Sequence, residues 1–383
     1  MTIFARVKKP VKNPIYINDA AMIAAIDSFT NQESAPFFKK KNKAWISPIS
    51  KVKEDQLQAF LRDHDAYKSL DRSVHLAIFA ARSLNHIPEQ TAVNIGSSRG
   101  ATGLWEEYYS RFRESGTVPT ATSPLTTLGN VSSWVAQDLG LKGTAFSHSI
   151  TCATASHAIL NAIAWLESGM ATSFIAGGSE APLTDFTIAQ MQALRIYSRE
   201  TGRYPCRSLD LDKSQNSMIL GEAAACFLLS KEDKNSLAKI TGYGSAIEKL
   251  NSPTSLTESG ECLQESMRQA IQHIDLETVD AIITHAPGTI KGDKAEFTAI
   301  KAVFGDRYPH LCNNKWQLGH SLGASSALNL HMAIEMLQSE TIFKIPYLEE
   351  ALVNPRGDVR VPNRILINAT GFGGNAVSLL VEK

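Results

Sequence analysis

The sequence predicts an α/β fold, because short apolar runs typical of buried strands alternate along the chain with longer helical patterns. The chain has 383 residues, of which 43% are hydrophobic and 20% charged, and this suits one large globular unit or two fused halves. No low-complexity linker separates independent modules. The expected strands cover residues 91–96, 172–178, 224–230 and 281–286. The expected helices cover residues 72–84, 153–169, 294–305 and 322–337.

Two pairs of similar segments predict that the chain is built from two structural halves. The segments SMILGEAAACFLLSKED and ILINATGFGGNAVSLLVEK each combine a small-residue turn with an apolar strand and a charged stop. In the same way, SITCATASHAILNAIAWL and WQLGHSLGASSALNLHMAI each run from a reactive side chain into a helix rich in alanine and serine. We therefore expect one half over residues 1–230 and the other over residues 231–383.

The composition excludes several classes of function. Lysine plus arginine equals aspartate plus glutamate at 38 each, so no global field favours nucleic acid or an anionic membrane as a partner. No stretch approaches the roughly 18 uncharged apolar residues of a membrane span, and no apolar region follows the basic N-terminus. The five cysteines are scattered without a CxxC pair, which argues against a disulfide framework or a zinc site. We expect a cytoplasmic protein.

Cys152 is the candidate nucleophile. It lies between a strand-like segment, residues 144–150, and a helix that begins at Ala153. The free N–H groups and the dipole at a helix N-terminus favour the thiolate, the nucleophilic form of cysteine, and can also hold an oxyanion. A single cysteine is more often a small core hydrophobe, so its surroundings must decide. The helix-start position predicts that Cys152 is the most readily alkylated of the five thiols.

Two of the ten histidines have settings that suit catalysis. His285 ends an apolar strand and opens a turn that contains proline and glycine, HAPGT. His320 lies in NKWQLGHSLGASS, which has the pattern of a strand-to-helix transition, and Lys315 precedes it. A neutral imidazole in such a place donates an N–H to a thioester or enolate oxygen, or acts as a general base. With Cys152, these residues form a Cys/His/His constellation.

Eight segments together carry a family resemblance that none of them carries alone. They are LDRSVHLAIFAARSL, NIGSSRGA, ITCATASHAI, FIAGGSEAPLTDF, LGEAAACFLL, THAPGTIKGDKAE, NKWQLGHSLGASS and GFGGNA, in this order. With these segments the chain, from Asp71 to its C-terminus, resembles the elongating β-ketoacyl-acyl-carrier-protein synthases of the thiolase superfamily. The resemblance implies a thiolase-like fold, in which two pseudo-symmetric α/β halves form a layered α-β-α-β-α sandwich.

The resemblance also implies an activity. Cys152 would carry the acyl group, His285 and His320 would be the catalytic histidines, and Lys315 would tune the site. The reaction would be decarboxylative Claisen condensation with a malonyl thioester held on an acyl carrier protein, and it requires neither a metal nor a redox cofactor. Members of this family dimerise, so the resemblance implies a homodimer or a heterodimer with a sister synthase.

Four more residues would bind the substrate. Phe372 matches the gating phenylalanine of the family, and its turn, with Gly371 and Gly373, would supply a second backbone N–H to the oxyanion hole beside that of Cys152. Thr289 matches a threonine that contacts the pantetheine arm.

The chain departs from the family pattern at three places. The turn after His285 reads HAPGT where the family has HGTxT, which removes one threonine hydroxyl from the pantetheine site. Asn329 replaces a family glutamate that pairs with the lysine. The family opens with a strand and a glycine-rich segment, whereas this chain has IYINDAAMIAA. These differences resemble specialised synthases of bacterial polyene pigment pathways, of the aryl polyene and flexirubin type, more than fatty-acid enzymes.

Two alternative functions follow from the same residues. A thiolase would share the fold but pairs one histidine with a second catalytic cysteine, and Cys312, the only cysteine near the late motifs, has no matching turn. A non-catalytic partner subunit, like the chain-length factors that accompany active synthases, would lack the cysteine. The presence of Cys152, His285, His320 and Lys315 argues against this second alternative, while Asn329 and the altered turn keep it open.

A run of lysines has two interpretations. The segment FFKKKNKAW brings together Lys39, Lys40, Lys41 and Lys43. Charge runs are most often solvated loops. A basic run also attracts an acidic partner, and acyl carrier proteins are acidic, so the second interpretation is a docking site for the carrier.

Overall fold

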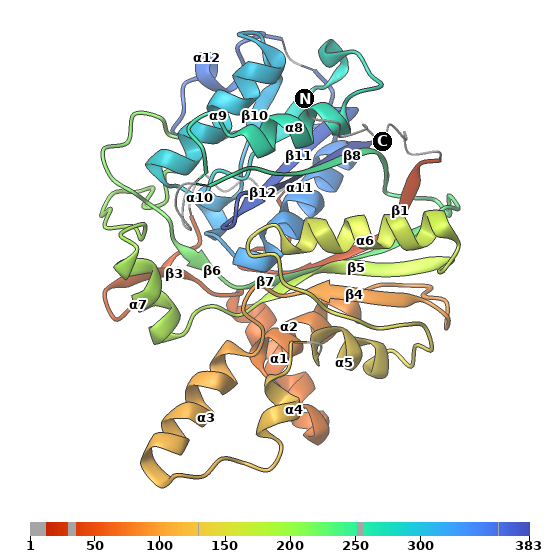
Figure 1. Ribbon diagram of the computed structural model, residues 1–383, viewed down its shortest axis with the longest axis vertical. Helices are drawn as coiled ribbons and strands as arrows, with labels where there is room; N and C mark the ends of the chain where they lie inside the picture. The colour runs from red at the N-terminus through yellow and green to blue at the C-terminus, as the bar shows by residue number, and fades with distance from the viewer. Residues whose placement is uncertain (1–12, 30–35, 129, 251–255, 359) are drawn as a thin grey trace.

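The protein is described by a computed structural model that covers residues 13–29, 36–128, 130–250, 256–358 and 360–383 (Figure 1). Within these residues, one sheet contains the strands β1 (Ile15–Ile23), β4 (Ala92–Gly96), β5 (Ser173–Glu180), β7 (Ala223–Ser230), β8 (Ala238–Ile247), β9 (Ala281–Ile283), β10 (His310–Cys312), β11 (Arg364–Gly371) and β12 (Asn375–Glu382). Their order is β10-β9-β11-β12-β8-β1-β7-β5-β4. A small second sheet contains β2 (Lys39–Lys41), β3 (Ala44–Ser47) and β6 (Leu220–Gly221).

Helices cover both faces of the large sheet and also lie between the strands at its two ends. They are α1 (Lys51–Asp63), α2 (Arg72–Ala81), α3 (Thr102–Ser115), α4 (Thr122–Thr126), α5 (Asn130–Asp138), α6 (Thr154–Ser168), α7 (Asp185–Ala193), α8 (Glu261–Ala270), α9 (Ile290–Phe304), α10 (Lys315–Leu318), α11 (Ser325–Ser339) and α12 (Glu350–Val353). In the part of the chain that the structure describes, no helix is both long enough and apolar enough to cross a bilayer.

Five layers are visible in Figure 1, from α8 and α9 at the top to α2 and α5 at the bottom. The middle layer consists of α6 and α11, which lie between an upper group of strands (β8 to β12) and a lower group (β4, β5 and β7). The apolar side chains of these two helices share one core with residues of both groups, such as Phe227 of β7 and Ile365 of β11. Separate apolar clusters attach α2 and α5 to the lower strands and α8 and α9 to the upper ones. Because both faces of the sheet are covered, strands such as β5 and β7 are buried along their whole length.

Strand β1 joins the two groups of strands. It pairs antiparallel with β7 from Tyr16 to Ile23, but with β8 only from Ile15 to Ile17. The segment IYINDAAMI therefore forms a strand, as the family resemblance predicts for this part of the chain, even though the glycines of that family segment are missing. The connection from β7 to β8 contains residue 231, where we divide the chain, and this division remains a prediction.

The structure differs from the expected elements at three places near the site. Residues 144–150 are not a regular strand: they make two backbone hydrogen bonds with Val93 of β4 and then turn away toward Cys152. A short helix, α10, precedes His320 in place of a strand. The helix expected from residue 294 begins at Ile290, because the Thr289 side chain accepts a hydrogen bond from Gly292 N and caps the helix there.

Candidate active site

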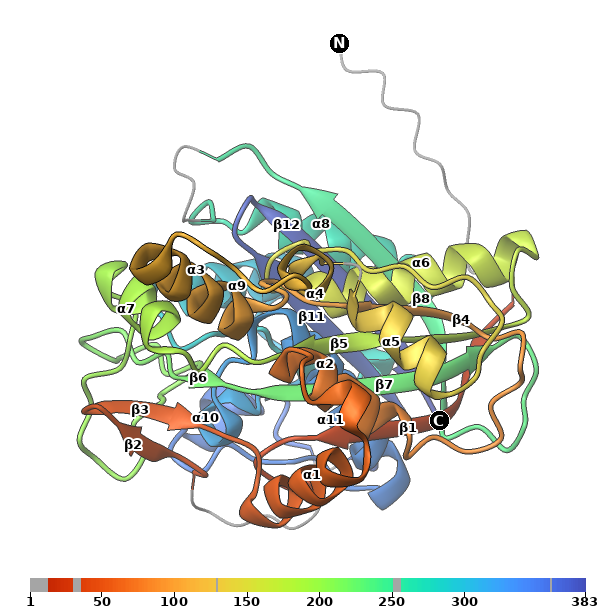
Figure 2. The ribbon, with the colours of Figure 1, turned by 90° about the horizontal axis from the view of Figure 1, so that it is seen from below.

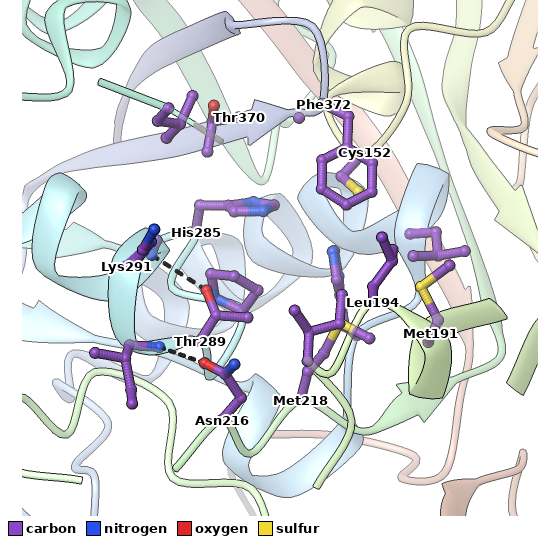
Figure 3. A pocket seen from close by; sticks show the side chains of 18 residues that line it. Cys152, Met191, Leu194, Asn216, Met218, His285, Thr289, Lys291, Thr370 and Phe372 are labelled. Carbon is purple, nitrogen blue, oxygen red and sulfur yellow. Dashed lines mark hydrogen bonds between the residues drawn. The ribbon is translucent and has the colours of Figure 1, made fainter. Parts of the chain in front are cut away.

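A pocket of about 530 Å³ brings together most of the residues that the sequence singles out (Figure 3). Those that line it are Cys152, His285, Thr289, His320, Gly371 and Phe372. Much of the remaining wall is apolar and comes from Met191, Leu194, Ile196, Met218, Leu256, Pro287 and Leu322. Lys315 and Gly373 lie outside the lining. Segments from the middle and from the C-terminal part of the chain therefore meet around one apolar cavity that contains a thiol and two imidazoles.

The nucleophile is held in place by close packing against a turn from the far end of the chain. Thr151, directly before Cys152, has a φ of 47°, an unusual backbone conformation for a β-branched residue. Its hydroxyl donates a hydrogen bond to the Phe372 carbonyl oxygen at 3.1 Å. A Cβ at Gly371 would collide with Thr151 Oγ1 and lie 2.9 Å from Cys152 N, so only glycine fits there. The Gly371–Phe372–Gly373 turn and Cys152 thus form one rigid unit.

The helix-start position predicts that Cys152 is a thiolate, and this prediction is wrong for the resting state of the site. Burial and, to a smaller extent, the Glu180 carboxylate raise the pKa of Cys152 to about 12, and Lys315 opposes this shift. Loss of hydration therefore outweighs the favourable position at the start of α6. At neutral pH the side chain is a thiol, and it must lose its proton as it attacks.

We expect the alkylation of Cys152 by iodoacetamide to accelerate with pH. Since only the thiolate reacts and the pKa is raised to about 12, the rate should rise about tenfold per pH unit between pH 7 and 9.5 without a plateau. The side chain of Cys152 is 8% exposed, whereas Cys206, Cys226 and Cys312 are fully buried and Cys262 is 1% exposed, so Cys152 should still be modified first. Peptide mapping at limiting reagent measures both points. A plateau below pH 8 would show a resting thiolate.

The two histidines lie side by side and are uncharged. Their ring centroids are 5.2 Å apart, with the planes nearly perpendicular. Burial, and then the nearby charge of Lys315, lowers the pKa of both His285 and His320 well below its usual value. Each ring has an Nδ1 atom with no hydrogen-bond partner among the described residues. At neutral pH, each imidazole therefore has one N–H to donate and one nitrogen that can accept a proton.

Lys315 lies fully buried behind the pocket, in α10. Burial lowers its pKa to about 8, and the Glu296 carboxylate is the strongest influence in the opposite direction. Asn329, which replaces the family glutamate, forms no ion pair but accepts a hydrogen bond from Asn314 Nδ2 at 3.0 Å. Glu296 in α9 therefore supplies the negative charge that the substitution at Asn329 removes.

Buried carboxylates hold the altered turn after His285. Glu296 accepts hydrogen bonds from His285 N at 2.8 Å and from Ala286 N at 2.6 Å, and Asp293 accepts one from Gly288 N at 3.0 Å. These bonds use backbone N–H groups, so the turn keeps its shape despite the departure from HGTxT. Thr289 Oγ1 accepts a hydrogen bond from Gly292 N at 3.2 Å, which leaves its own O–H to donate into the pocket.

Two further residues of the site, Glu180 and Glu296, were not predicted from the sequence. Glu180 ends β5 and accepts hydrogen bonds from Ser98 N at 2.7 Å and Gly323 N at 2.9 Å, so it ties the loop after β4 to the segment that leads into α11. The signal was an acidic residue at the end of a largely apolar strand, since a buried carboxylate requires several hydrogen-bond donors. For Glu296 the signal was its place on the helix that follows His285.

Protein-family models match most of the chain. The model described as "Beta-ketoacyl synthase, N-terminal domain" covers residues 30–235, and "Beta-ketoacyl synthase, C-terminal domain" covers residues 237–348. The chain belongs to the β-ketoacyl synthase family. The predictions of the family and of an acyltransferase enzyme class are therefore confirmed.

Individual relatives of this synthase agree with that assignment. Nodulation protein E of Rhizobium sp. (strain N33) is 28% identical over 79% of the chain and 77% of its own length. The 3-oxoacyl-[acyl-carrier-protein] synthase 2 of Staphylococcus aureus (strain N315) is 27% identical over 94% of the chain and 92% of its own length. Among solved structures, the ishigamide ketosynthase/chain length factor superposes with a TM-score of 0.82 at 19% identity, covering 97% of this chain and 99% of that one. The last comparison confirms the predicted fold class.

Proposed function

We propose that this synthase takes an acyl group from a carrier protein onto Cys152 and extends it by decarboxylative Claisen condensation with a malonyl thioester. The observation that carries the proposal is one apolar pocket lined by Cys152 and by the two neutral imidazoles of His285 and His320. A thiol alone would suit many reactions. The thiol together with two neutral N–H donors suits a reaction in which an acyl group is stored while an enolate is formed beside it.

The first half-reaction transfers the acyl group. The Cys152 sulfur attacks the acyl thioester carbonyl, and a new S–C bond forms while the bond to the carrier sulfur breaks. Because Cys152 is protonated at rest, a neutral imidazole of the pocket accepts its proton and returns it to the departing carrier thiol. The backbone N–H groups of Cys152 and Phe372 hold the oxyanion between these events.

The second half-reaction makes the carbon–carbon bond. The malonyl thioester loses carbon dioxide, and the resulting enolate oxygen accepts N–H hydrogen bonds from His285 and His320. The enolate carbon then attacks the acyl carbonyl, and the Cys152 sulfur leaves as a thiolate that takes up one proton from solvent to restore the resting thiol. Burial, helped by the nearby charge of Lys315, lowers the pKa of both imidazoles and keeps them neutral, and the positive charge of Lys315 also stabilises the negative charge of the enolate. The apolar walls keep water away from the acyl enzyme.

The partners belong to the same proposal. An acyl carrier protein would deliver both thioesters, with its pantetheine arm running past Thr289, as the name of the Staphylococcus aureus relative supports. A homodimer or a heterodimer with a sister synthase agrees with the ishigamide ketosynthase/chain length factor, whose name pairs two such chains. The cytoplasmic location and the polyene pigment pathway stay predictions.

An acyl-transfer assay tests the proposal. The purified synthase is mixed with acyl carrier protein thioesters of several chain lengths, and its intact mass is measured before and after malonyl carrier protein is added. We expect an acyl adduct at Cys152 that disappears as a β-ketoacyl carrier protein forms. A chain that takes up no acyl group but raises the turnover of a sister synthase would be a non-catalytic partner subunit instead.

A further inference from the structure

Helix α7 ends in a backbone motif that forms one wall of the pocket. The Arg195 N–H donates a hydrogen bond to the Gln192 carbonyl oxygen at 2.9 Å, and the Ile196 N–H donates one to the Met191 carbonyl oxygen at 3.4 Å. These two bonds define a Schellman motif, in which the first residue beyond the helix takes a left-handed conformation. Met191 and Ile196 thereby come together in one apolar cluster, and both line the pocket with Leu194. The end of α7 therefore sets where this apolar wall lies.

The motif contains an arginine where glycine is the usual residue. Arg195 has a φ of 57°, which is unfavourable for any residue other than glycine. An arginine therefore needs contacts beyond those of the motif to stay in this conformation. One such contact is a side-chain hydrogen bond, because Asn216 Nδ2 donates to the Arg195 carbonyl oxygen at 2.9 Å. The shape of the wall thus depends in part on Asn216.

Asn216 also connects this wall to the wall across the pocket. Its Oδ1 accepts a hydrogen bond from Ile290 N, at the first residue of α9, at 2.8 Å. Figure 3 shows Leu194, from the end of α7, and Lys291, from the start of α9, on opposite sides of the pocket. One carboxamide group therefore fixes the spacing between the end of α7 and the start of α9.

The residues that follow Asn216 are held by backbone bonds that do not involve its side chain. The Ser217 N–H donates to the Gly288 carbonyl oxygen at 2.8 Å, and the Met218 N–H donates to the Ile196 carbonyl oxygen at 3.2 Å. Two residues after Met218 the chain enters β6, which pairs with β3, and Figure 2 shows α7 at the same end of the molecule as these two strands. Removal of the Asn216 side chain should therefore loosen the pocket wall and leave the fold intact.

We propose that Asn216 is a positioning residue that determines specificity: it keeps the pocket narrow by fixing the end of α7 relative to the start of α9, and so selects unbranched acyl chains. The inference rests on the proposed function, because it takes the group on Cys152 to be an acyl chain. The wall formed by Met191, Leu194 and Ile196 would contact that chain, while Asn216 would act through the position of the wall. A branched chain is wider at its branch, so it fits only if the two walls separate.

Asn216→Ala tests this role with two acyl donors, octanoyl-pantetheine and its isomer with a single methyl branch in the middle of the chain. The second-order rate constant for acylation of Cys152, followed by intact-protein mass, is measured for each donor. The wild-type protein should prefer the straight isomer about tenfold, which is the usual scale of discrimination for one methyl group in an apolar pocket. In Asn216→Ala the preference should fall to about twofold, mainly because the branched isomer reacts faster. A melting temperature within about 3 °C of the wild type shows that the variant is folded.

Arg195→Gly supplies a readout that general damage to the fold would not give. Glycine adopts the left-handed conformation without strain, so the wall should keep its position even without the bond from Asn216. The double variant Arg195→Gly/Asn216→Ala should therefore regain a preference of about fivefold for the straight isomer. Such a recovery would link the two residues in one function.

The matched control is Gln215→Ala, at the neighbouring position. Gln215 Nε2 donates to Glu200 Oε1 at 2.8 Å, and Gln215 is not among the described residues that line the pocket. This variant should keep the wild-type preference. If Asn216→Ala misfolds, Asn216→Asp replaces it, since a carboxylate still accepts from Ile290 N but has no N–H to donate to Arg195.

Four outcomes overturn the role of Asn216. They are a wild-type protein without preference for the straight isomer, an unchanged preference in the Asn216 variant, an equal loss in Gln215→Ala, and no recovery in the double variant. A wild-type protein that takes up neither thioester on Cys152 overturns the proposed function instead.

Discussion

Cys152→Gln is expected to form no β-ketoacyl product while it still releases carbon dioxide from malonyl carrier protein. The substitution removes the sulfur that stores the acyl group but leaves both imidazoles, Lys315 and the turn around Gly371 in place. Because decarboxylation depends on the N–H donors and not on the thiol, that step should survive at a rate within about tenfold of the wild-type enzyme. Carbon dioxide release and product mass are measured on one preparation.

A buried cysteine outside the pocket provides the control for this variant. Cys226 lies in β7 and is fully buried, so Cys226→Ala should lower stability by about 1 kcal/mol and leave both half-reactions intact. Condensation by Cys152→Gln at any measurable rate would show that Cys152 is not the acyl carrier. Loss of decarboxylation together with condensation, in a variant that melts like the wild type, would show that the thiol takes part in both steps.

Strands buried on both faces were predictable from the sequence, and strands with mixed surroundings were not. Residues 224–229 are uniformly apolar, and β7 begins only one residue before the expected strand, at Ala223. The segment 144–150 contains two serines and a histidine. The Ser147 hydroxyl donates a hydrogen bond to the Ile95 carbonyl oxygen at 2.9 Å, whereas in a regular half-exposed strand it would face solvent. An apolar run directly indicates a buried strand. Whether a segment with polar side chains forms a strand or a loop depends on hydrogen-bond partners that are distant in the sequence.

The members of the site were predictable, but their protonation was not. Cys152, His285 and His320 carry local motifs, and the pocket brings all three together as expected. The charge state of Cys152 depends on how much water the assembled layers exclude and on Glu180, at the end of β5. In the same way, the counter-charge for Lys315 comes from Glu296 and not from the position where the family motif places it. Sequence motifs identify which residues come together in the site, whereas the loss of hydration caused by distant elements sets the pKa values of their side chains.

His285→Ala and His320→Ala are expected to reverse the behaviour of the cysteine variant. Each substitution removes one N–H donor to the enolate oxygen, so decarboxylation of malonyl carrier protein should fall about 100-fold or more. Acylation of Cys152 should persist to a measurable degree, because the oxyanion is held by backbone N–H groups and the other imidazole can accept the thiol proton. Intact-protein mass and carbon dioxide release on the same preparation separate the two effects.

The pH dependence of the wild-type enzyme adds a second test of the same roles. Because the pKa of both histidines is lowered well below 6.5, the imidazoles stay neutral as pH falls from 7 to 6, and decarboxylation should remain constant there. Above pH 8, Lys315 loses its charge and the rate should decline. His273→Ala, at an exposed position outside the pocket lining, should match the wild type at every pH. If His320→Ala decarboxylates at the wild-type rate, or if the wild-type rate falls between pH 7 and 6 as an ordinary histidine titrates, the neutral imidazoles are not the donors to the enolate.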